Sequence, residues 1–359
     1  IGQTIRGWMI LFTPMRSRRS AEDDLGVSEV IGVVMLLAMV ITMMGGVFVI
    51  LTPYVNDFQD NTAWANANGM AERIDGRIDV VAGSSADTGI RTTVPSATSS
   101  VAPISNIELW TVAADLTADD VVTVTYLNQT TFSILAHNET ATSANIWTQN
   151  GEVNISFQPS HEEVLINHNL SVLDMYIITV NDADENPIHR QARITVSGLL
   201  IKTKVQTGEH TIALINDARY NKFASGPWSI SSGPDLKIEE LFDGTMRASM
   251  SIRDVNSGSM PDGRNAVFDI SSQGPIELFS GDAWNFRFNF ESSLGSTVSQ
   301  QMTETWLTDY TLNRAADTLD QHRGISPWLR ASGSDGMTID GGNTMIDLEI
   351  DLQMVVVSG

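Results

Sequence analysis

The sequence predicts an α+β protein: a long N-terminal membrane-spanning and amphipathic helix followed by a large, mainly antiparallel, sandwich-like β region with one further helix. Three observations carry this prediction. Residues 30–52 form an apolar run, residues 64–81 carry apolar side chains at helical spacing, and the chain beyond Gly83 changes to short segments of β-branched and aromatic residues separated by turns.

The apolar run has the length of a membrane span. No charged residue occurs between Val30 and Asn56, and Val30–Thr52 is almost wholly Val, Ile, Leu, Met, Ala and Gly. A helix needs about 20 such residues to cross a bilayer, whereas a secretory signal has an apolar region of about 7–15 and a small-residue cleavage site, which is absent here. A core helix of a soluble protein is the alternative, and the uniformity of the run favours the membrane.

The flanking charges predict the orientation of this span. Arg16, Arg18 and Arg19 precede it, while Asp57 and Asp60 follow. Because positive charge stays in the cytoplasm, we expect a single-pass protein with a cytoplasmic N-terminus and an extracellular C-terminal region.

The helix is expected to continue to Gly83, with Pro53 removing one backbone donor inside it. Its apolar stripe repeats at spacings of three and four and consists of Trp64, Ala67, Ala71, Ile74, Ile78 and Val81. This helix either rests on its own domain or packs against neighbouring molecules, and the sequence leaves both open.

Alternating segments predict strands throughout the remainder. They are residues 121–127, 130–135, 152–157, 173–180, 193–205, 210–215, 246–252, 265–270, 284–290 and 345–357. Residues 299–321 have helical spacing and predict a helix that packs on the sheet. The domains expected are a leader (1–26), the helix (27–83) and two β-rich regions (84–230 and 231–359) that alternatively form one domain.

The amino-acid composition limits the classes of partner that the chain is expected to bind. The net charge is −22, the chain has no Cys, and there are four Lys against 17 Arg. Such an acidic surface disfavours nucleic acid and anionic lipid as partners and suits a protein in salty water. An ordinary acidic extracellular domain has the same composition.

Motifs for chemistry are scarce in the sequence. The six His have no metal-ligand spacing, and no phosphate loop, G-x-S-x-G or G-x-G-x-x-G occurs. Asp182, Asp184 and Asn186 begin like a calcium loop but lack its Gly and its Glu, so a turn between strands is the better interpretation. We expect no enzyme, no catalytic or metal-binding residues and no cofactor.

Four N-x-S/T patterns cluster in one region. Their asparagines are Asn128, Asn138, Asn154 and Asn169. Each is a candidate N-glycosylation site on a translocated face, and chance in an Asn- and Thr-rich region is the alternative.

The leader and the start of the apolar run resemble archaeal type IV pilins and pilin-like proteins. The residues that carry the resemblance are Gly26, Val27, Ser28, Val30, Ile31 and Gly32, read "GVSEVIG" with Glu29 where the family often has Pro. The resemblance implies that a prepilin peptidase cuts a prepilin signal peptide in the region of Leu25, Gly26, Val27 and Glu29 and leaves the apolar segment in the mature chain. It covers residues 16–81 and leaves the large β region unmatched. We also expect translation to begin at Met15, with residues 1–14 outside the natural product.

The sequence therefore predicts a membrane-inserted surface protein, a structural or adhesive and possibly minor subunit of an archaeal type IV pilus-like filament. Its partners would be other pilin-like subunits, a prepilin peptidase and membrane lipid. Small residues that let apolar helices approach closely are Gly32, Ala38, Gly45 and Gly46. The alternative is a stand-alone, membrane-anchored extracellular binding or cell-envelope protein.

Overall fold

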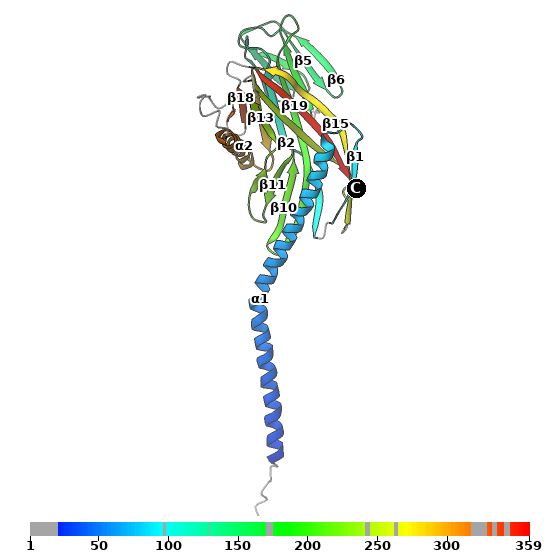
Figure 1. Cartoon of the computed structure of the whole chain (residues 1–359), viewed down its shortest axis with the longest axis vertical. Helices are drawn as coiled ribbons and strands as arrows, with labels where there is room; N and C mark the ends of the chain where they lie inside the picture. Colours follow the sequence, from blue (N-terminus) through cyan, green and yellow to red (C-terminus); the bar gives the residue numbers. More distant parts are fainter. Residues whose placement is uncertain are drawn as a thin grey trace, which may run out of the picture. The chain divides into compact units, whose positions relative to one another are not determined.

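A computed structural model of the chain describes residues 21–95, 98–128, 130–169, 175–240, 245–261, 265–316, 329–331, 336–340 and 345–359. The chain divides into two compact units, one that ends at Gln59 and one that begins at Asp60. The α+β prediction is confirmed: one long apolar N-terminal helix precedes a large, mainly antiparallel β region with one more helix (Figure 1).

Helix α1 runs from Ala21 to Ala82. Pro53 lies inside it and does not end it, although Pro removes one backbone hydrogen bond. The Thr42 hydroxyl donates to the Ala38 carbonyl at 2.7 Å, and the Thr52 hydroxyl donates to the Phe48 carbonyl at 2.6 Å. The first six residues of the helix, Ala21–Gly26, belong to the predicted leader.

The β region begins after a turn at residues 83–88. Its strands are β1 Gly89–Pro95, β2 Ser99–Asp115, β3 Val122–Asn128, β4 Thr131–Ala136, β5 Ser143–Thr148, β6 Gly151–Ser156, β7 Val164–Asn167, β8 Met175–Asn181, β9 Pro187–Val205, β10 Gly208–Ile215, β11 Ala218–Lys222, β12 Trp228–Ser232, β13 Leu236–Glu240, β14 Met246–Ser257, β15 Asn265–Ala283, β16 Asn285–Ser292, β17 Leu329–Ala331, β18 Gly336–Asp340 and β19 Ile346–Ser358.

The described strands form three sheets. The five-stranded sheet has the order β1-β15-β19-β14-β13, and the three-stranded sheet has the order β3-β4-β7. The largest sheet runs β12-β11-β10-β9-β2-β16-β18-β17, with β8, β5 and β6 attached through β9. The pair β14–β19 is parallel and the other described pairs are antiparallel. Strands from both sides of residue 230 therefore share a sheet.

The main core lies between the five-stranded sheet and the largest sheet. Trp110 of β2, Phe286 of β16, Met250 of β14 and Ile350 of β19 belong to one buried cluster. Helix α2, Ser296–Ala316, adds Trp306, whose indole lies 5.2 Å from the Phe288 ring. Burial of such large apolar side chains supplies most of the favourable free energy of folding.

A second buried cluster lies between α1 and both of these sheets. The α1 stripe packs on Ile212 and Leu214 of β10, Phe268 of β15 and Val355 of β19. Side chains alternate across a strand, so Ile212 and Leu214 face this helix while Ala213 and Ile215 face the main core. The amphipathic part of the helix thus rests on its own β region, which decides between the two alternatives that the sequence left open.

A third cluster builds a separate lobe from β3, β4, β5, β7 and β8. Its centre includes Phe132, Ile134, Ile146 and Ile178, each at most 1% exposed. Figure 1 shows β5 and β6 at the opposite end of the β-rich unit from the label of β10.

The sequence placed several boundaries incorrectly. Helix α2 begins at Ser296 and not at 299, and its predicted end at 321 lies outside the described residues. Strand β2 was missed entirely, because Pro103 and a register shift between Ile104 and Glu108 interrupt its alternation. Strand β15 extends to Ala283, well beyond the predicted end at 270, because two register shifts disturb its pattern.

Ile74 tests how firmly the helix is held. Its side chain is 0% exposed against both sheets, so Ile74→Ala should lower the free energy of unfolding of the β-rich unit by about 2–5 kcal/mol. The measurement is denaturant unfolding of the full chain in detergent, followed by tryptophan fluorescence. Val80→Ala on the same helix, where the side chain is 60% exposed, should change it by less than about 0.5 kcal/mol. Equal effects of the two changes would contradict the packing.

Candidate functional site

The first candidate site is the apolar part of α1. Between Val30 and Phe58 its large apolar side chains are 44–75% exposed. Among the described residues, one helix is long and apolar enough to cross a membrane, and this segment supplies its apolar window. A continuous apolar surface of this size needs a non-aqueous partner, either lipid or other apolar helices.

The predicted small-residue positions lie on this exposed segment. A Cβ placed on Gly32, Gly45 or Gly46 would meet no other atom within 4 Å, and Ala38 is also exposed. These positions are open to a neighbouring helix, and that neighbour stays a prediction. Leu25, Gly26 and Val27 lie on α1, but their side chains are outside those described, and the Glu29 side chain is exposed.

The four predicted glycosylation asparagines all have exposed side chains in one lobe. Asn128 ends β3, Asn138 follows β4, Asn154 lies on β6 and Asn169 follows β7. The Asn138 amide donates to the Asp119 carbonyl, and the Asn128 side-chain oxygen accepts from the Thr130 backbone at 2.8 Å. Their clustering is therefore spatial as well as sequential.

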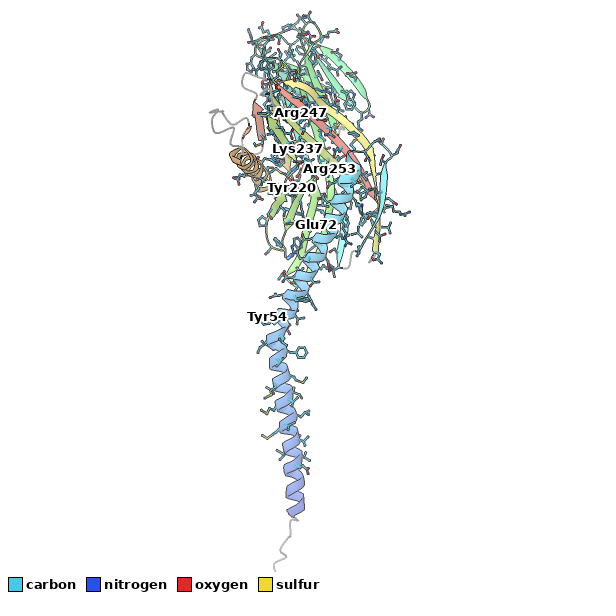
Figure 2. The ribbon with its side chains drawn as sticks, in the orientation of Figure 1. Tyr54, Glu72, Tyr220, Lys237, Arg247 and Arg253 are labelled. Atoms are coloured by element: carbon cyan, nitrogen blue, oxygen red, sulfur yellow. The ribbon has the colours of Figure 1, made fainter. Side chains whose placement is uncertain are left out.

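The second candidate site centres on Arg253 of β14, whose side chain is 9% exposed. Its guanidinium donates to Asp79 of α1 at 2.6 Å and to Asp217 of the β10–β11 turn at 2.7 Å. It also reaches Gln353 of β19 at 3.4 Å, and its backbone N–H donates to the side chain of Asn216 at 2.6 Å. One side chain therefore joins the helix to both sheets. Figure 2 shows the label of Arg253 beside α1.

The turn that supplies Asp217 follows from its sequence. Asn216 and Asp217 have positive φ of 48° and 60°, and Ile215 pairs directly with Ala218. A two-residue hairpin turn of this kind requires positive φ at both central residues, and Asn and Asp adopt it more readily than most residues. The dipeptide "ND" between two alternating segments was the available signal for this turn, but nothing in the sequence linked it to Arg253.

A third carboxylate adds negative charge beside Arg253. Oxygens of Asp75, Asp79 and Asp217 lie within 4.8 Å of one another. Burial, with repulsion from Asp79 and Asp217, raises the pKa of Asp75 to about 6. Burial also raises the pKa of Asp217 against the attraction of Arg253. Three carboxylates so close together resemble a cation site. The guanidinium of Arg253 already pairs with two of them, Asp79 and Asp217, and so occupies the place of a cation.

A polar groove of about 280 Å³ opens beside Arg253. It lies over the outer face of β13, β14 and β19, and its lining is Asp217, Asp235, Lys237, Ser249, Met250, Ser251, Arg253, Glu349, Asp351 and Gln353. Across these strands, Ser251 donates to Asp351 at 2.5 Å and Arg247 pairs with Asp347 at 2.7 Å. Within the lining itself, Lys237 pairs with Asp235 and Arg253 pairs with Asp217, while Glu349 and Asp351 leave the lining net negative.

Two buried polar networks lie elsewhere in the β-rich unit. Glu108 accepts from the Tyr220 hydroxyl at 2.6 Å and from the Trp110 indole at 2.9 Å. Burial raises the pKa of Glu108 to about 7, against the hydrogen bonds from these two groups and Ser292. Glu108 and Trp110 are two residues apart on β2, so their side chains point to the same, inward face of the sheet. The Glu108 carboxyl group therefore enters the core, where the Tyr220 hydroxyl contacts it.

The other network holds a buried His–Asp pair at the base of the lobe. His189 Nδ1 lies 2.6 Å from an Asp115 oxygen, and Asn285 donates to the second oxygen at 2.6 Å. Burial raises the pKa of Asp115, but the hydrogen bond and charge of His189 and the charge of Arg287 outweigh it, so this pKa is lowered. His189 is 0% exposed, so this pair has no access to a substrate and serves the fold.

The predicted calcium-like sequence is a turn between β8 and β9. Asp182 accepts from the backbone N–H groups of Asp184 and Asn186 at 2.9 and 2.8 Å, which is a local turn arrangement. The interpretation as a turn is confirmed.

Comparisons of the chain with known protein families, with curated proteins and with solved structures found no match. Functional inference for this chain therefore depends on its residues and on its geometry.

Asp75 predicts a dependence of stability on pH. Its pKa is raised from 3.8 to about 6, so the folded chain holds this proton more tightly than the unfolded chain does. The resulting stability is complete below about pH 4 and is lost as the pH rises through about 6. Asp75→Asn should therefore be more stable than the wild type at pH 8, by about 1–3 kcal/mol, with the difference vanishing near pH 4.

Thermal unfolding of the full chain in detergent, measured from pH 4 to pH 8, checks this. The control is Glu72→Gln on the same helix, whose side chain is 71% exposed and lies 3.8 Å from Arg219, and which should change the pH profile much less than Asp75→Asn does. Parallel profiles for wild type and Asp75→Asn would refute the raised pKa.

Proposed function

We propose that the chain is a pilin-like, membrane-inserted surface protein that serves as a structural or adhesive subunit of an archaeal type IV pilus-like filament. Residues 30–52 form its membrane span and later its assembly surface. The sandwich-like β-rich unit faces the outside of the cell and carries glycans on the lobe with the four exposed asparagines.

One observation carries the proposal. A single helix, α1, has two kinds of surface: its apolar residues up to Phe58 are exposed, and its stripe from Ala67 to Val81 is buried in the β-rich unit. A filament subunit needs this division, because one part of the helix must fix the head and the other must remain open to other subunits. Close packing of apolar helices relies on small residues, which Gly45 and Gly46 supply.

A stand-alone membrane-anchored exoprotein is the second candidate. It is favoured by the same buried stripe, because the unit covers residues 67–82 by itself and leaves only the apolar segment for any partner. In that case the apolar segment contacts lipid and never leaves the membrane.

The pair Gly45 and Gly46 distinguishes the two functions. Substituting both by Leu would separate the backbones of packed helices while making the segment more apolar. We expect the double variant to insert into the membrane normally and to be lost from filaments. The measurement is peptide identification in sheared filaments and in membrane fractions of the producing cells.

Met43→Leu with Met44→Leu is the matched control, because it changes two adjacent exposed residues at nearly constant volume. This control should enter filaments. Normal incorporation of the glycine double variant would refute the packing, and wild-type protein found only as a membrane monomer would establish the stand-alone anchor.

The proposal also predicts processing at the cytoplasmic edge of the span. A prepilin peptidase should cut next to Gly26 and leave Val30–Thr52 in the mature chain, since the basic leader lies so close to the apolar run. N-terminal sequencing of the membrane-bound protein checks this. A mature terminus beyond Thr52, or a retained leader, would count against a prepilin signal.

A further inference from the structure

Three of the four lysines of this acidic chain gather at one end of the largest sheet. Lys202 of β9 and Lys222 of β11 each lie opposite Thr211 of β10, on its two sides. Lys204 lies two residues along β9 on the same face, opposite Glu209. Residues 199–228 carry four Lys or Arg against two Asp or Glu, whereas the chain as a whole carries 21 against 43. We name Lys202, Lys204 and Lys222 the lysine row.

The lysine row keeps its charges available. Within the described part of the chain, no ion pair joins any of its three lysines to a carboxylate. The Lys222 ammonium lies 5.6 Å from the centre of the Trp228 ring, a cation–π distance that leaves the charge in place. The fourth lysine, Lys237, belongs to the other large sheet and pairs with Asp235 at 3.3 Å.

Aromatic side chains lie on both faces of the sheet at this end. Trp228 pairs directly with Lys222 and shares the face of the lysine row, whereas His210 has the parity of Ile212 and lies on the face toward α1. Trp64 of α1 contacts His210 and Phe223, with ring centres 5.4 and 5.2 Å apart. Phe223 is 48% exposed, although it is large and apolar. Two features are typical of the membrane interface. Tryptophan lies at the level of the headgroups, and lysine buries its apolar stem while extending its ammonium group to the headgroups.

This end of the unit is also the end through which the chain enters. The Gln206 backbone in the β9–β10 turn donates to Asp60, the first residue of the unit, at 2.8 Å. Thr52, the last residue of the apolar run, precedes Asp60 by eight residues, which span about 12 Å as a helix. The lysine row therefore lies at the end of the unit that its covalent connection to the apolar run keeps near the bilayer.

We propose that the lysine row and its aromatic neighbours dock the β-rich unit on the anionic lipid headgroups of the membrane that holds α1. The inference rests on the membrane insertion within the proposed function and does not need the filament. The strong net negative charge of the chain does not oppose it, because screening limits the reach of distant charges to about 8 Å.

The absence of Cys from the sequence permits a direct test with a single spin label. The full chain carrying Thr207→Cys, in the exposed β9–β10 turn, is labelled and reconstituted into vesicles of phosphatidylcholine, alone or with an equal part of phosphatidylglycerol. Broadening of the label by a nickel-chelating lipid reports contact with the surface. We expect contact in the anionic vesicles and much less in the neutral ones. A label at Asn150→Cys, in the β5–β6 turn of the lobe, should show none.

Substituting the whole lysine row by Gln should lower the ratio of docked to free units by roughly fivefold per lysine, or on the order of 100-fold for three. Lys237→Gln is the matched control and should leave the ratio unchanged. Equal contact in both vesicle types, or equal effects of the triple change and the control, would overturn the inference. Contact that increases with the density of protein in neutral vesicles would overturn it in favour of a second copy of the chain as the partner.

Vesicle flotation separates this result from a failure of the proposed function. A chain that floats with the vesicles but shows no lysine-dependent contact overturns only the docking surface. A chain that does not float overturns membrane insertion and the docking surface together.

Discussion

The burial of the α1 stripe against two sheets is the constraint on which the β-rich unit depends. Ile74 and Ile78 are almost fully covered by residues of β9, β10, β15 and β19, which lie in different sheets. Arg253 adds a polar connection at the end of the same contact, joining Asp79 of the helix to Asp217 of one sheet and Gln353 of the other. The Arg253 side chain is only 9% exposed whereas that of Asp79 is 51% exposed, so loss of a carboxylate partner would leave a nearly buried guanidinium short of its hydrogen bonds, which makes the position of the helix specific.

This arrangement separates the helix into two functional parts. Residues after Asp60 belong to the fold and their apolar side chains are already covered. Residues before it keep an apolar surface that only lipid or similar helices match. The buried acids, Glu108 and Asp115, belong to networks inside the β region and have no role in this division. The groove beside Arg253 is lined by four carboxylates and two cationic side chains, so its lining is net negative.

Local patterns in the sequence predicted the helix and ten of the described strands, including both strands of the hairpins β3–β4, β8–β9 and β9–β10, because the periodicities of helices and strands are local. The apolar stripe from Trp64 to Val81 was correctly identified. The sequence left open whether this stripe packs on its own domain or on neighbouring molecules. Arg253 was missed because its partner Asp79 is 174 positions away. The lysine row was also invisible, since Lys202 and Lys222 become neighbours only when β9 and β11 pair on either side of Thr211. Strand β2 was missed for another reason, the left-handed backbone of Asn106 and the register shift around it.

The place of β19 in its sheet imposes an order on biosynthesis. It lies between β15 and β14, although it follows both of them in the sequence, and Val355 and Val357 also cover the α1 stripe. The helix is synthesised first, yet its buried face is complete only when this last described strand has been synthesised and has paired. During that interval the apolar stripe and the unpaired edges of β14 and β15 are exposed, which is a hazard for aggregation. The nascent chain thus needs a chaperone or rapid synthesis until β19 inserts.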